Sequence, residues 1–248
     1  MNELTYGISI YVEDTGKTYH TLNDWGFALG NNNYIGDPEM ETSYITIPGR
    51  DGLLDISEAI SGRRIYRQRP LSFSLGGIRE RLSWDGLISE LRNEINGRIC
   101  KLTLDNDKGY FWRGRVYITE FDRFQKLGTF TLSVPMAEPY KYATQSSGEP
   151  WLWDPFNFRT GIITYVGQIT VSGSASITIP HGYMPTTPEF IVSSKTGDLT
   201  VTVGSIPYYL NVGTNKIPSI MVGGDTDVEL VFAASAAKLE IFYRSGSL

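Results

Sequence analysis

Short runs of alternating apolar and polar residues recur along the chain and predict a mainly β protein. In the first part of the chain they predict strands at residues 4–12, 44–47, 71–75, 99–104, 110–121 and 128–134. Residues 105–109 have turn composition, so the runs on either side of them predict a hairpin. Loop composition at 14–17, 31–33 and 36–38 separates the earlier runs.

One segment has the period of an amphipathic helix. Its apolar residues fall at i, i+3, i+4, i+7 and i+11 and are Trp84, Leu87, Ile88, Leu91 and Ile95. Ser83 can cap this helix, Asp85 lies in its positive first turn, and Gly97 can end it. The single apolar stripe predicts a helix that packs on a core, with no ligand site.

The later part of the chain repeats the β pattern at intervals typical of sandwiches. Its alternating runs are residues 162–171, 175–179, 189–193, 199–203, 208–212, 228–232 and 238–243. Asp225, Asp227 and Glu229 alternate with apolar or neutral residues, which predicts the solvated face of an edge strand. A metal site on these three carboxylates is the less favoured interpretation.

Charge divides the chain into two parts. Of 22 Lys and Arg residues, 17 lie in residues 1–147, together with 19 of the 27 Asp and Glu residues. The change falls in a segment of turn composition, so we predict domains at 1–145 and 146–248. The net charge of −5 disfavours indiscriminate binding to nucleic acid.

The segment that opens the second part is rich in aromatic residues. It contains Trp151, Trp153, Phe156 and Phe158. These side chains could form a stacking surface or seal a seam between domains, and the second interpretation is favoured because buried Trp and Phe normally belong to cores or interfaces.

The cysteine count and the lengths of the apolar runs indicate the compartment in which the protein is made. Cys100 is the only cysteine, so no internal disulfide can form, and its setting predicts a buried strand residue. No apolar run approaches the roughly 18 residues of a membrane span. The first residues lack the charged start and apolar core of a signal peptide, so we expect synthesis in the cytoplasm.

Motifs for catalysis are missing from the sequence. The chain has two histidines, His20 and His181, and lacks a nucleophile elbow, a phosphate-binding glycine loop and a zinc-protease motif. Asp105 and Asp107 resemble the start of a calcium loop, but its sixth and twelfth positions hold Tyr110 and Val116. We therefore expect no enzyme, no cofactor and no metal, although 27 acidic residues leave a carboxylate pair open.

The chain is organised around a segment between the strands at 44–47 and 71–75. Pro48, Gly49 and Gly52 give it a tight polar turn, and little apolar periodicity follows. Its cations are Arg63, Arg64, Arg67 and Arg69. They could bind a nucleic-acid backbone, or lie on a solvated arm, or pair with acidic surfaces of a neighbouring subunit. The acidic net charge favours the neighbouring subunit, and a closed ring would satisfy every copy equally.

Ordered motifs in this part of the chain carry a resemblance. They are Ile-Pro-Gly-Arg-Asp-Gly-Leu-Leu-Asp at 47–55, Glu-Ala at 58–59, Arg-Pro-Leu-Ser-Phe-Ser-Leu at 69–75, Asn-Gly-Arg at 96–98, Gly-Tyr-Phe-Trp-Arg-Gly-Arg-Val at 109–116 and Ala-Glu-Pro-Tyr-Lys-Tyr at 137–142. In this set the chain resembles the distal tail protein (Dit) family of long, non-contractile-tailed phages (siphophages) and related prophages. Residues 148–248 resemble the second domain of that family, with weaker motifs.

The resemblance implies a fold and an assembly. The fold is an N-terminal β-sandwich or split barrel with one helix and a projecting belt arm, at about 48–70, followed by a C-terminal galectin-like β-sandwich. Six copies would form a ring, possibly two rings back to back, around a channel through which DNA passes. The implied partners are the major tail tube protein, the hub or tail-associated lysin, and receptor-binding or other baseplate proteins. The implied location is the distal end of the virion tail, without membrane insertion.

Two hypotheses about function follow. In the favoured one the chain is a structural ring component, whose contacts between subunits are Arg50, Asp51, Arg63, Arg64, Tyr66, Arg67 and Arg69. In the alternative it is a carbohydrate-binding adhesin that acts through its second domain, where Trp151, Trp153, Tyr208 and Tyr209 could contact a sugar. Galectin sites use a His, Asn, Arg and Trp constellation, whereas this domain has one histidine, His181.

Overall fold

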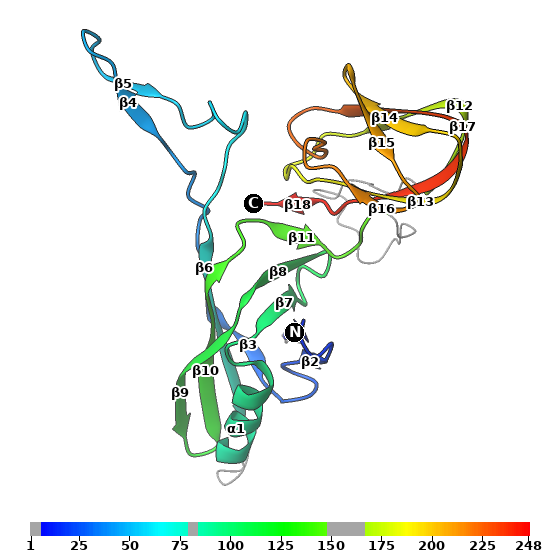
Figure 1. The fold of residues 1–248 in the computed structure, drawn as a ribbon. Helices are drawn as coiled ribbons and strands as arrows, with labels where there is room; N and C mark the ends of the chain where they lie inside the picture. Colours follow the sequence, from blue (N-terminus) through cyan, green and yellow to red (C-terminus); the bar gives the residue numbers. More distant parts are fainter. Residues whose placement is uncertain (1–5, 79–83, 148–166) are drawn as a thin grey trace. The chain divides into compact units, whose positions relative to one another are not determined.

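The computed structural model describes residues 6–78, 84–147 and 167–248, and its chain forms two compact units (Figure 1). The first unit comprises Met1–Asp107 with Phe111–Pro139, and the second comprises Lys108–Tyr110 with Tyr140–Leu248. The predicted domain boundary between residues 145 and 146 lies near this division and stays a prediction.

Two antiparallel sheets build the first unit. One has the order β2-β1-β7-β8 and the other the order β3-β6-β10-β9. The strands of the first are β1 (Ile8–Val12), β2 (Thr18–His20), β7 (Ile99–Leu104) and β8 (Tyr110–Arg115). Those of the second are β3 (Ala28–Ile35), β6 (Arg69–Ile78), β9 (Tyr117–Phe124) and β10 (Leu127–Ala137).

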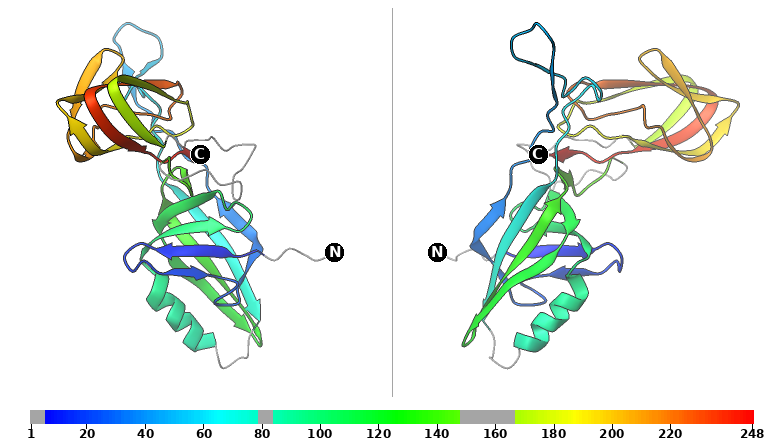
Figure 2. Two further views of the ribbon diagram at one scale, coloured as in Figure 1. Left: turned by 90° about the vertical axis from the view of Figure 1, so that its right-hand side faces the viewer. Right: turned by 60° about the vertical axis from the view of Figure 1, so that its left-hand side comes forward.

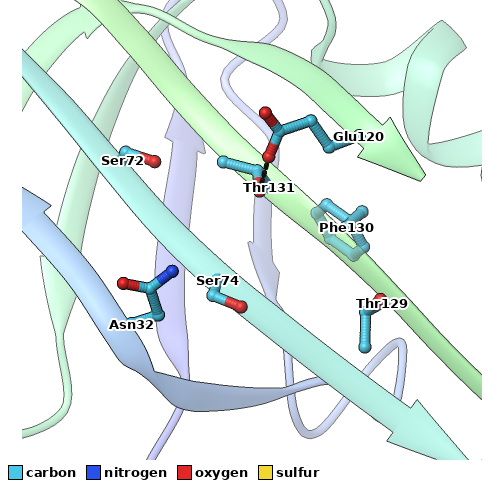
Figure 3. Close-up of a pocket in the computed structure, with 7 residues that line it drawn as sticks. All are labelled: Asn32, Ser72, Ser74, Glu120, Thr129, Phe130 and Thr131. Carbon is cyan, nitrogen blue, oxygen red and sulfur yellow. Dashed lines mark hydrogen bonds between the residues drawn. The ribbon is translucent and has the colours of Figure 1, made fainter. Parts of the chain in front are cut away.

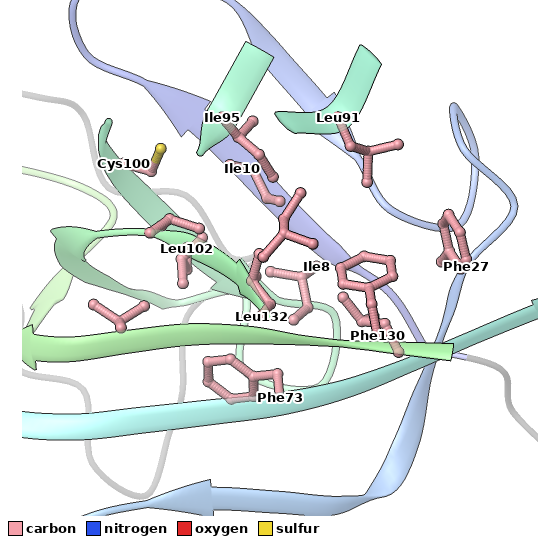
Figure 4. Packing of buried hydrophobic residues seen from close by; sticks show 14 of the residues in the cluster. Ile8, Ile10, Phe27, Phe73, Leu91, Ile95, Cys100, Leu102, Phe130 and Leu132 are labelled. Carbon is pink, nitrogen blue, oxygen red and sulfur yellow. The ribbon is translucent and has the colours of Figure 1, made fainter. Parts of the chain in front are cut away.

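The core of this unit lies between the two sheets and the helix α1 (Trp84–Ile95). Figure 4 shows Ile8 and Ile10 of β1 close to Phe130 and Leu132 of β10. All five residues of the predicted apolar stripe of the helix are buried, which confirms the helix and its orientation. Its predicted cap, Ser83, lies outside the described residues. Cys100 is buried as predicted, and burial raises the pKa of its thiol to about 12.

The predicted strand at 110–121 is in fact two strands in different sheets. The break falls at Val116, whose main-chain N–H donates to Arg98 O (2.9 Å) and whose carbonyl accepts from Gly97 N (2.7 Å). These bonds hold the chain at the C-terminal end of α1 while it passes from β8 to β9. The alternating pattern runs through this crossing, so the sequence does not reveal it.

The predicted loop at 31–33 is also wrong, because these residues belong to β3. The register of β3 against β6 shifts between Leu29 and Asn33, so the strand contains a bulge. The Asn33 side chain replaces missing ladder bonds: its Oδ1 accepts from Ser74 N (3.1 Å) and its Nδ2 donates to Gly30 O (2.6 Å). Asparagine therefore stabilises an irregular strand here rather than a loop.

The second unit is built on one curved sheet with the order β15-β14-β17-β13-β16, in which β12 also pairs with β17. The strands are β12 (Gln168–Ile179), β13 (Glu189–Thr196), β14 (Leu199–Val203), β15 (Ile206–Leu210), β16 (Gly213–Lys216) and β17 (Val228–Phe242). A short antiparallel pair outside this sheet, β11 (Lys141–Ala143) and β18 (Gly246–Ser247), also belongs to the unit. The mainly β fold is confirmed, and the galectin-like character of this unit stays a prediction.

Strand β17 combines two runs that the sequence separates. Leu230 and Phe232 are buried in its first half, and Leu239 and Ile241 are buried in its second half. The inward positions change from even to odd numbers between the halves, because the register of β17 against β12 shifts between Ala234 and Ala237, where β17 has an extra residue. The four alanines at 233, 234, 236 and 237 lie in the middle of the strand, where small side chains allow the bend.

The prediction that residues 225–229 form an edge strand is wrong. Glu229 belongs to β17, which is paired on both sides, and its carboxylate accepts from Ser176 Oγ at 2.6 Å. Asp227 accepts from His181 N and pairs with His181 Nδ1, both at 2.8 Å. These bonds lower the pKa of the Asp227 carboxyl and fasten the loop that follows β12.

Parts of several predictions lie outside the described residues. These parts are residues 4–5 of the first predicted strand, the aromatic segment with Trp151, Trp153, Phe156 and Phe158, and residues 162–166 of the run at 162–171.

Gly128 tests the packing of the first unit, because a Cβ at this position would lie 2.6 Å from Cη2 of the fully buried Trp84. We expect Gly128→Ala to lower the free energy of unfolding by about 1–3 kcal/mol, since the indole ring has to move. Gly76→Ala is the matched control, because its Cβ would meet Thr129 Cγ2 at an ordinary 3.7 Å. Denaturant unfolding of both variants makes the comparison, and equal stabilities would contradict the packing described.

Candidate subunit interface

Two segments of chain leave the second sheet together and form an arm, residues 37–68. The first segment begins directly after Gly36. The second segment ends directly before Arg69 and Pro70. Gly36 N donates to Pro70 O at 2.8 Å, and a Cβ at residue 36 would lie only 2.8 Å from Pro70 Cδ. Glycine therefore allows the two segments to start in close contact. In Figures 1 and 2 the arm and α1 lie at opposite ends of β6.

Main-chain hydrogen bonds keep the two segments together beyond this root. Arg67 N donates to Glu39 O and Glu41 N donates to Ile65 O, each at 2.8 Å. Farther out the strands β4 (Tyr44–Thr46) and β5 (Leu53–Asp55) pair as an antiparallel hairpin. The arm is thus a long, thin ladder, of which the sequence predicts β4 but not β5.

The end of the hairpin is a tight turn, as the sequence predicts. Arg50 N donates to Ile47 O at 3.1 Å, and the backbone has positive φ at Gly49 (+82°) and Gly52 (+76°). Added Cβ atoms would meet nothing within 4 Å at either glycine, so the constraint is conformational. The turn presents Arg50 and Asp51 to solvent.

A polar cluster closes the base of the hairpin. Ser57 donates to Asp55 Oδ1 from both its hydroxyl (2.5 Å) and its main-chain N–H (2.9 Å). These two bonds lower the pKa of the Asp55 carboxyl. Ser57 Oγ also accepts from Ser43 N at 2.9 Å, which ties the two strands together without any apolar contact.

The arm exposes its apolar side chains. From residue 37 to residue 68 no residue is buried, and none joins either hydrophobic core. Tyr44 is 52% exposed, Leu53 is 59% exposed and Ile60 is 96% exposed. Further exposed apolar residues of the arm are Ile45, Ile47 and Ile65. A two-stranded hairpin is marginally stable in water, and apolar groups gathered on it mark a contact surface.

The predicted cations flank these apolar residues. Arg50, Arg64 and Arg67 are exposed, and Arg63 and Tyr66 are half-buried. Arg67 Nη2 lies 3.9 Å from Glu41 Oε1, a loose surface pair that contributes little to stability. The arm therefore exposes both apolar and cationic side chains, and six of the seven predicted interface residues lie on it.

Arg69 differs from the other predicted interface residues. It is the first residue of β6 and is only 5% exposed, and its guanidinium carbon lies 4.4 Å above the Trp112 ring. Burial lowers the pKa of this guanidinium, and the charge of Asp37 offsets only part of the effect. Arg69 thus belongs to the root of the arm rather than to its exposed surface.

A polar pocket of about 250 Å³ lies on the outer face of the sheet β3-β6-β10-β9 (Figure 3). It is lined by Asn32, Ser72, Ser74, Glu120, Thr129, Phe130 and Thr131. Glu120 has a positive φ of 53° at a bulge, and its carboxylate accepts from Thr131 Oγ1 at 2.8 Å. The lining offers hydrogen bonds and one carboxylate, which provides no pair of groups for acid–base catalysis.

The suspected calcium loop has a structural role. Asp105 Oδ2 accepts from Gly7 N at 2.6 Å, and both carboxylate oxygens lie 3.2 Å from His20 Nε2. Among the described residues, no three His, Cys, Asp or Glu side chains are grouped as a metal site would require. Within the same residues, no helix has the length and hydropathy needed to cross a membrane.

Comparison with solved structures identifies the architecture. The crystal structure of SPP1 Dit, described as a paradigm of the hub adsorption apparatus in phages infecting Gram-positive bacteria, matches with a TM-score of 0.61. The match covers 99% of this chain and 100% of that one at 13% identity. The chain has the Dit fold.

A chain of the phage P2 baseplate in its activated conformation with Ca also matches, at 10% identity and a TM-score of 0.42, over 99% of this chain and 100% of that one. No protein-family model matches the sequence, and no curated protein matches it. The match to SPP1 Dit confirms the predicted resemblance at the level of the fold.

The sequence predicts the arm and its cations but not the apolar side chains that the arm exposes. Leu53, Leu54 and Ile60 have neither period 2 nor period 3.6, so no pattern assigned them to a surface or a core. The absence of a regular period could itself have indicated their exposure. Apolar residues in a segment that cannot form its own core are either exposed to solvent or covered by another chain.

Limited proteolysis tests the exposure of the arm. We expect trypsin to cut after Arg50, Arg64 or Arg67 before it cuts after Arg98 or Arg113, because the arm, unlike the segments around Arg98 and Arg113, can open without disturbing a core. Mass spectrometry of the first fragments from a dilute sample identifies the sites. Cleavage after Arg98 or Arg113 at the same rate as in the arm would contradict the structure of the arm.

Proposed function

We propose that the chain is a structural component of a phage tail tip, which self-assembles through its arm. The observation that carries this proposal is the arm itself, residues 37–68, with exposed Tyr44, Leu53 and Ile60 and no core of its own. Burying such side chains against a second copy is favourable by roughly 25 cal/mol per Å². In the monomer these side chains stay exposed to water and contribute no burial energy to stability.

The proposed assembly is a hexameric ring, or two rings back to back. The arm lies at one end of β6 and contacts a different surface on the next copy, which is the heterologous contact from which closed rings are built. The Dit fold supports this proposal, since SPP1 Dit is described as part of a hub adsorption apparatus. The ring would surround a channel for DNA in transit.

The ring would have protein partners on both faces at the distal end of the virion tail. We propose the major tail tube protein on one side, and the hub or tail-associated lysin on the other. Receptor-binding or other baseplate proteins would attach at its periphery. In this role the chain is not an enzyme, and Arg50, Asp51, Arg63, Arg64, Tyr66 and Arg67 contact neighbouring copies.

The alternative function, a carbohydrate-binding adhesin, has one observation in its favour. Tyr209 of β15 is exposed and could stack on a sugar ring, whereas Tyr208 packs against the core of the second unit and His181 is paired with Asp227. Trp151 and Trp153 lie outside the described residues. A glycan array without binding removes this alternative.

Light scattering tests the proposed assembly. The monomer mass is 27.7 kDa, so we expect the purified chain to approach about 166 kDa, six times that mass, or twice this value as its concentration rises. Leu53→Ser combined with Ile60→Ser should reduce this association at least tenfold. It should not lower the melting temperature of a dilute, monomeric sample, because neither side chain packs on its own core.

The matched control is Ile206→Ser, which removes a side chain of similar exposure (56%) from β15 of the second unit. It should associate as the unmodified chain does. If the double variant in the arm assembles as well as this control, the arm is not the contact and the proposal fails.

A further inference from the structure

Three large apolar side chains form a row across the solvent face of the sheet β3-β6-β10-β9, at one end of the sheet. In the ladder Leu127 of β10 lies directly opposite Ile78 of β6 on one side and Phe124 of β9 on the other. Directly opposite residues share a face, with Cβ atoms about 4.5–5.5 Å apart, so the three side chains are neighbours. Ile78 is 76% exposed, Phe124 is 73% exposed and Leu127 is 47% exposed. These three residues are the apolar row.

The apolar row interrupts a face that is otherwise polar or small. The next positions on this face are Gly76 of β6, Thr129 of β10 and Asp122 of β9, which pair across the strands. The polar pocket of Figure 3 lies farther along the same face. No residue of the row joins the hydrophobic core of the unit. Single exposed apolar residues are ordinary, whereas a contiguous group marks a contact surface.

The row lies at the end of the sheet opposite the arm. Arg69, which directly follows the arm, is the first residue of β6, and Ile78 is its last residue. In Figure 1 the arm leaves one end of β6, and the turn between β9 and β10 lies at the other end. The two ends of one sheet therefore expose apolar side chains of two different surfaces. A heterologous contact joins two such different surfaces on successive copies.

The face around the row is acidic. Asp122 and Glu120 of β9 are exposed on it. The four strands contain two cations, of which Arg69 is buried at the root of the arm and Arg123 pairs with a carboxylate of α1 at 2.7 Å. The turn between β9 and β10 adds one cation, Lys126. The two carboxylates thus leave this surface with a net negative charge.

These properties complement those of the arm. The arm exposes Leu53 and Ile60, and its exposed cations include Arg50 and Arg67. Contact between the arm and the row would remove apolar groups of both surfaces from water. Opposite charges around the contact would favour the encounter and disfavour an acidic partner, such as nucleic acid, on the row.

We propose that the apolar row is the surface on which the arm of the next copy docks. This inference rests on the proposed function and names the second half of its contact. Each copy places its arm on one neighbour and receives the arm of the other neighbour on its row. A closed ring then covers both apolar surfaces of every copy, whereas an open chain of copies leaves one arm and one row exposed.

Substitution of the row tests this inference by light scattering. The row variant, Ile78→Thr with Phe124→Thr, should associate at least tenfold more weakly than the unmodified chain, because threonine keeps the strand propensity and removes the apolar surface. The melting temperature of a dilute, monomeric sample should stay close to that of the unmodified chain, since neither side chain belongs to the core. The matched control is Tyr183→Thr with Ile206→Thr, which removes two exposed apolar side chains of the second unit and should associate normally.

A mixture of two variants tests which surfaces meet. The arm variant, Leu53→Ser with Ile60→Ser, keeps an intact row, and the row variant keeps an intact arm. Mixed at a concentration at which each variant alone is monomeric, they should form a species of about twice the monomer mass of 27.7 kDa and nothing larger. Each pair has one complete contact, and its other two surfaces are defective. A mixture that stays monomeric at every concentration overturns the inference.

The outcomes separate this inference from the proposed function. If the arm variant is monomeric and the row variant assembles as the control does, the arm docks elsewhere and the inference fails, while the proposed function stands. If the unmodified chain stays monomeric at every concentration, the proposed self-assembly fails first. If the row variant melts at a lower temperature, Phe124→Thr alone, at the end of β9, leaves β6 unchanged and should still weaken association; normal association of this variant overturns the inference.

Discussion

The structure depends on one constraint: residues 37–68 cannot bury their own apolar side chains. Two paired segments of chain have no interior, so Tyr44, Leu53 and Ile60 face water in the monomer. Removing them from water requires another surface, and in the ring proposed above a second copy of the chain would supply one at every position. The two-sheet unit then acts as a rigid base that fixes where the arm starts and in which direction it leaves.

Close packing of the chain at the root of the arm stabilises this base. Gly36 lets the two arm segments approach each other, and β6 continues the second segment into the centre of a sheet, where Leu71, Phe73 and Leu75 are buried. Ten residues of strand thus join an exposed arm to a close-packed core. Arg69, the first residue of β6 and its one charged residue, is also buried, with its guanidinium against the Trp112 ring.

Periodicity predicted the parts of this fold whose neighbours are local or regular. The stripe from Trp84 to Ile95 gave the helix and its buried face, and alternation gave most of the strands. It failed where irregular geometry mattered, as at the bulge of β3 around Asn33 and the crossing at Val116. The cations of the arm were visible as composition, but the burial of Arg69 depends on Trp112, 43 positions later in the sequence, which no local pattern reveals.

Hydrogen–deuterium exchange at two concentrations measures the central claim most directly. The claim is that the arm is solvated in the monomer and covered in the assembly. Peptides spanning residues 44–55 and 56–68 should exchange rapidly in a dilute sample and become protected in a concentrated one, while peptides of β7 and β17 stay protected in both. Equal exchange of the arm at the two concentrations, in a sample shown to be assembled, would contradict this account.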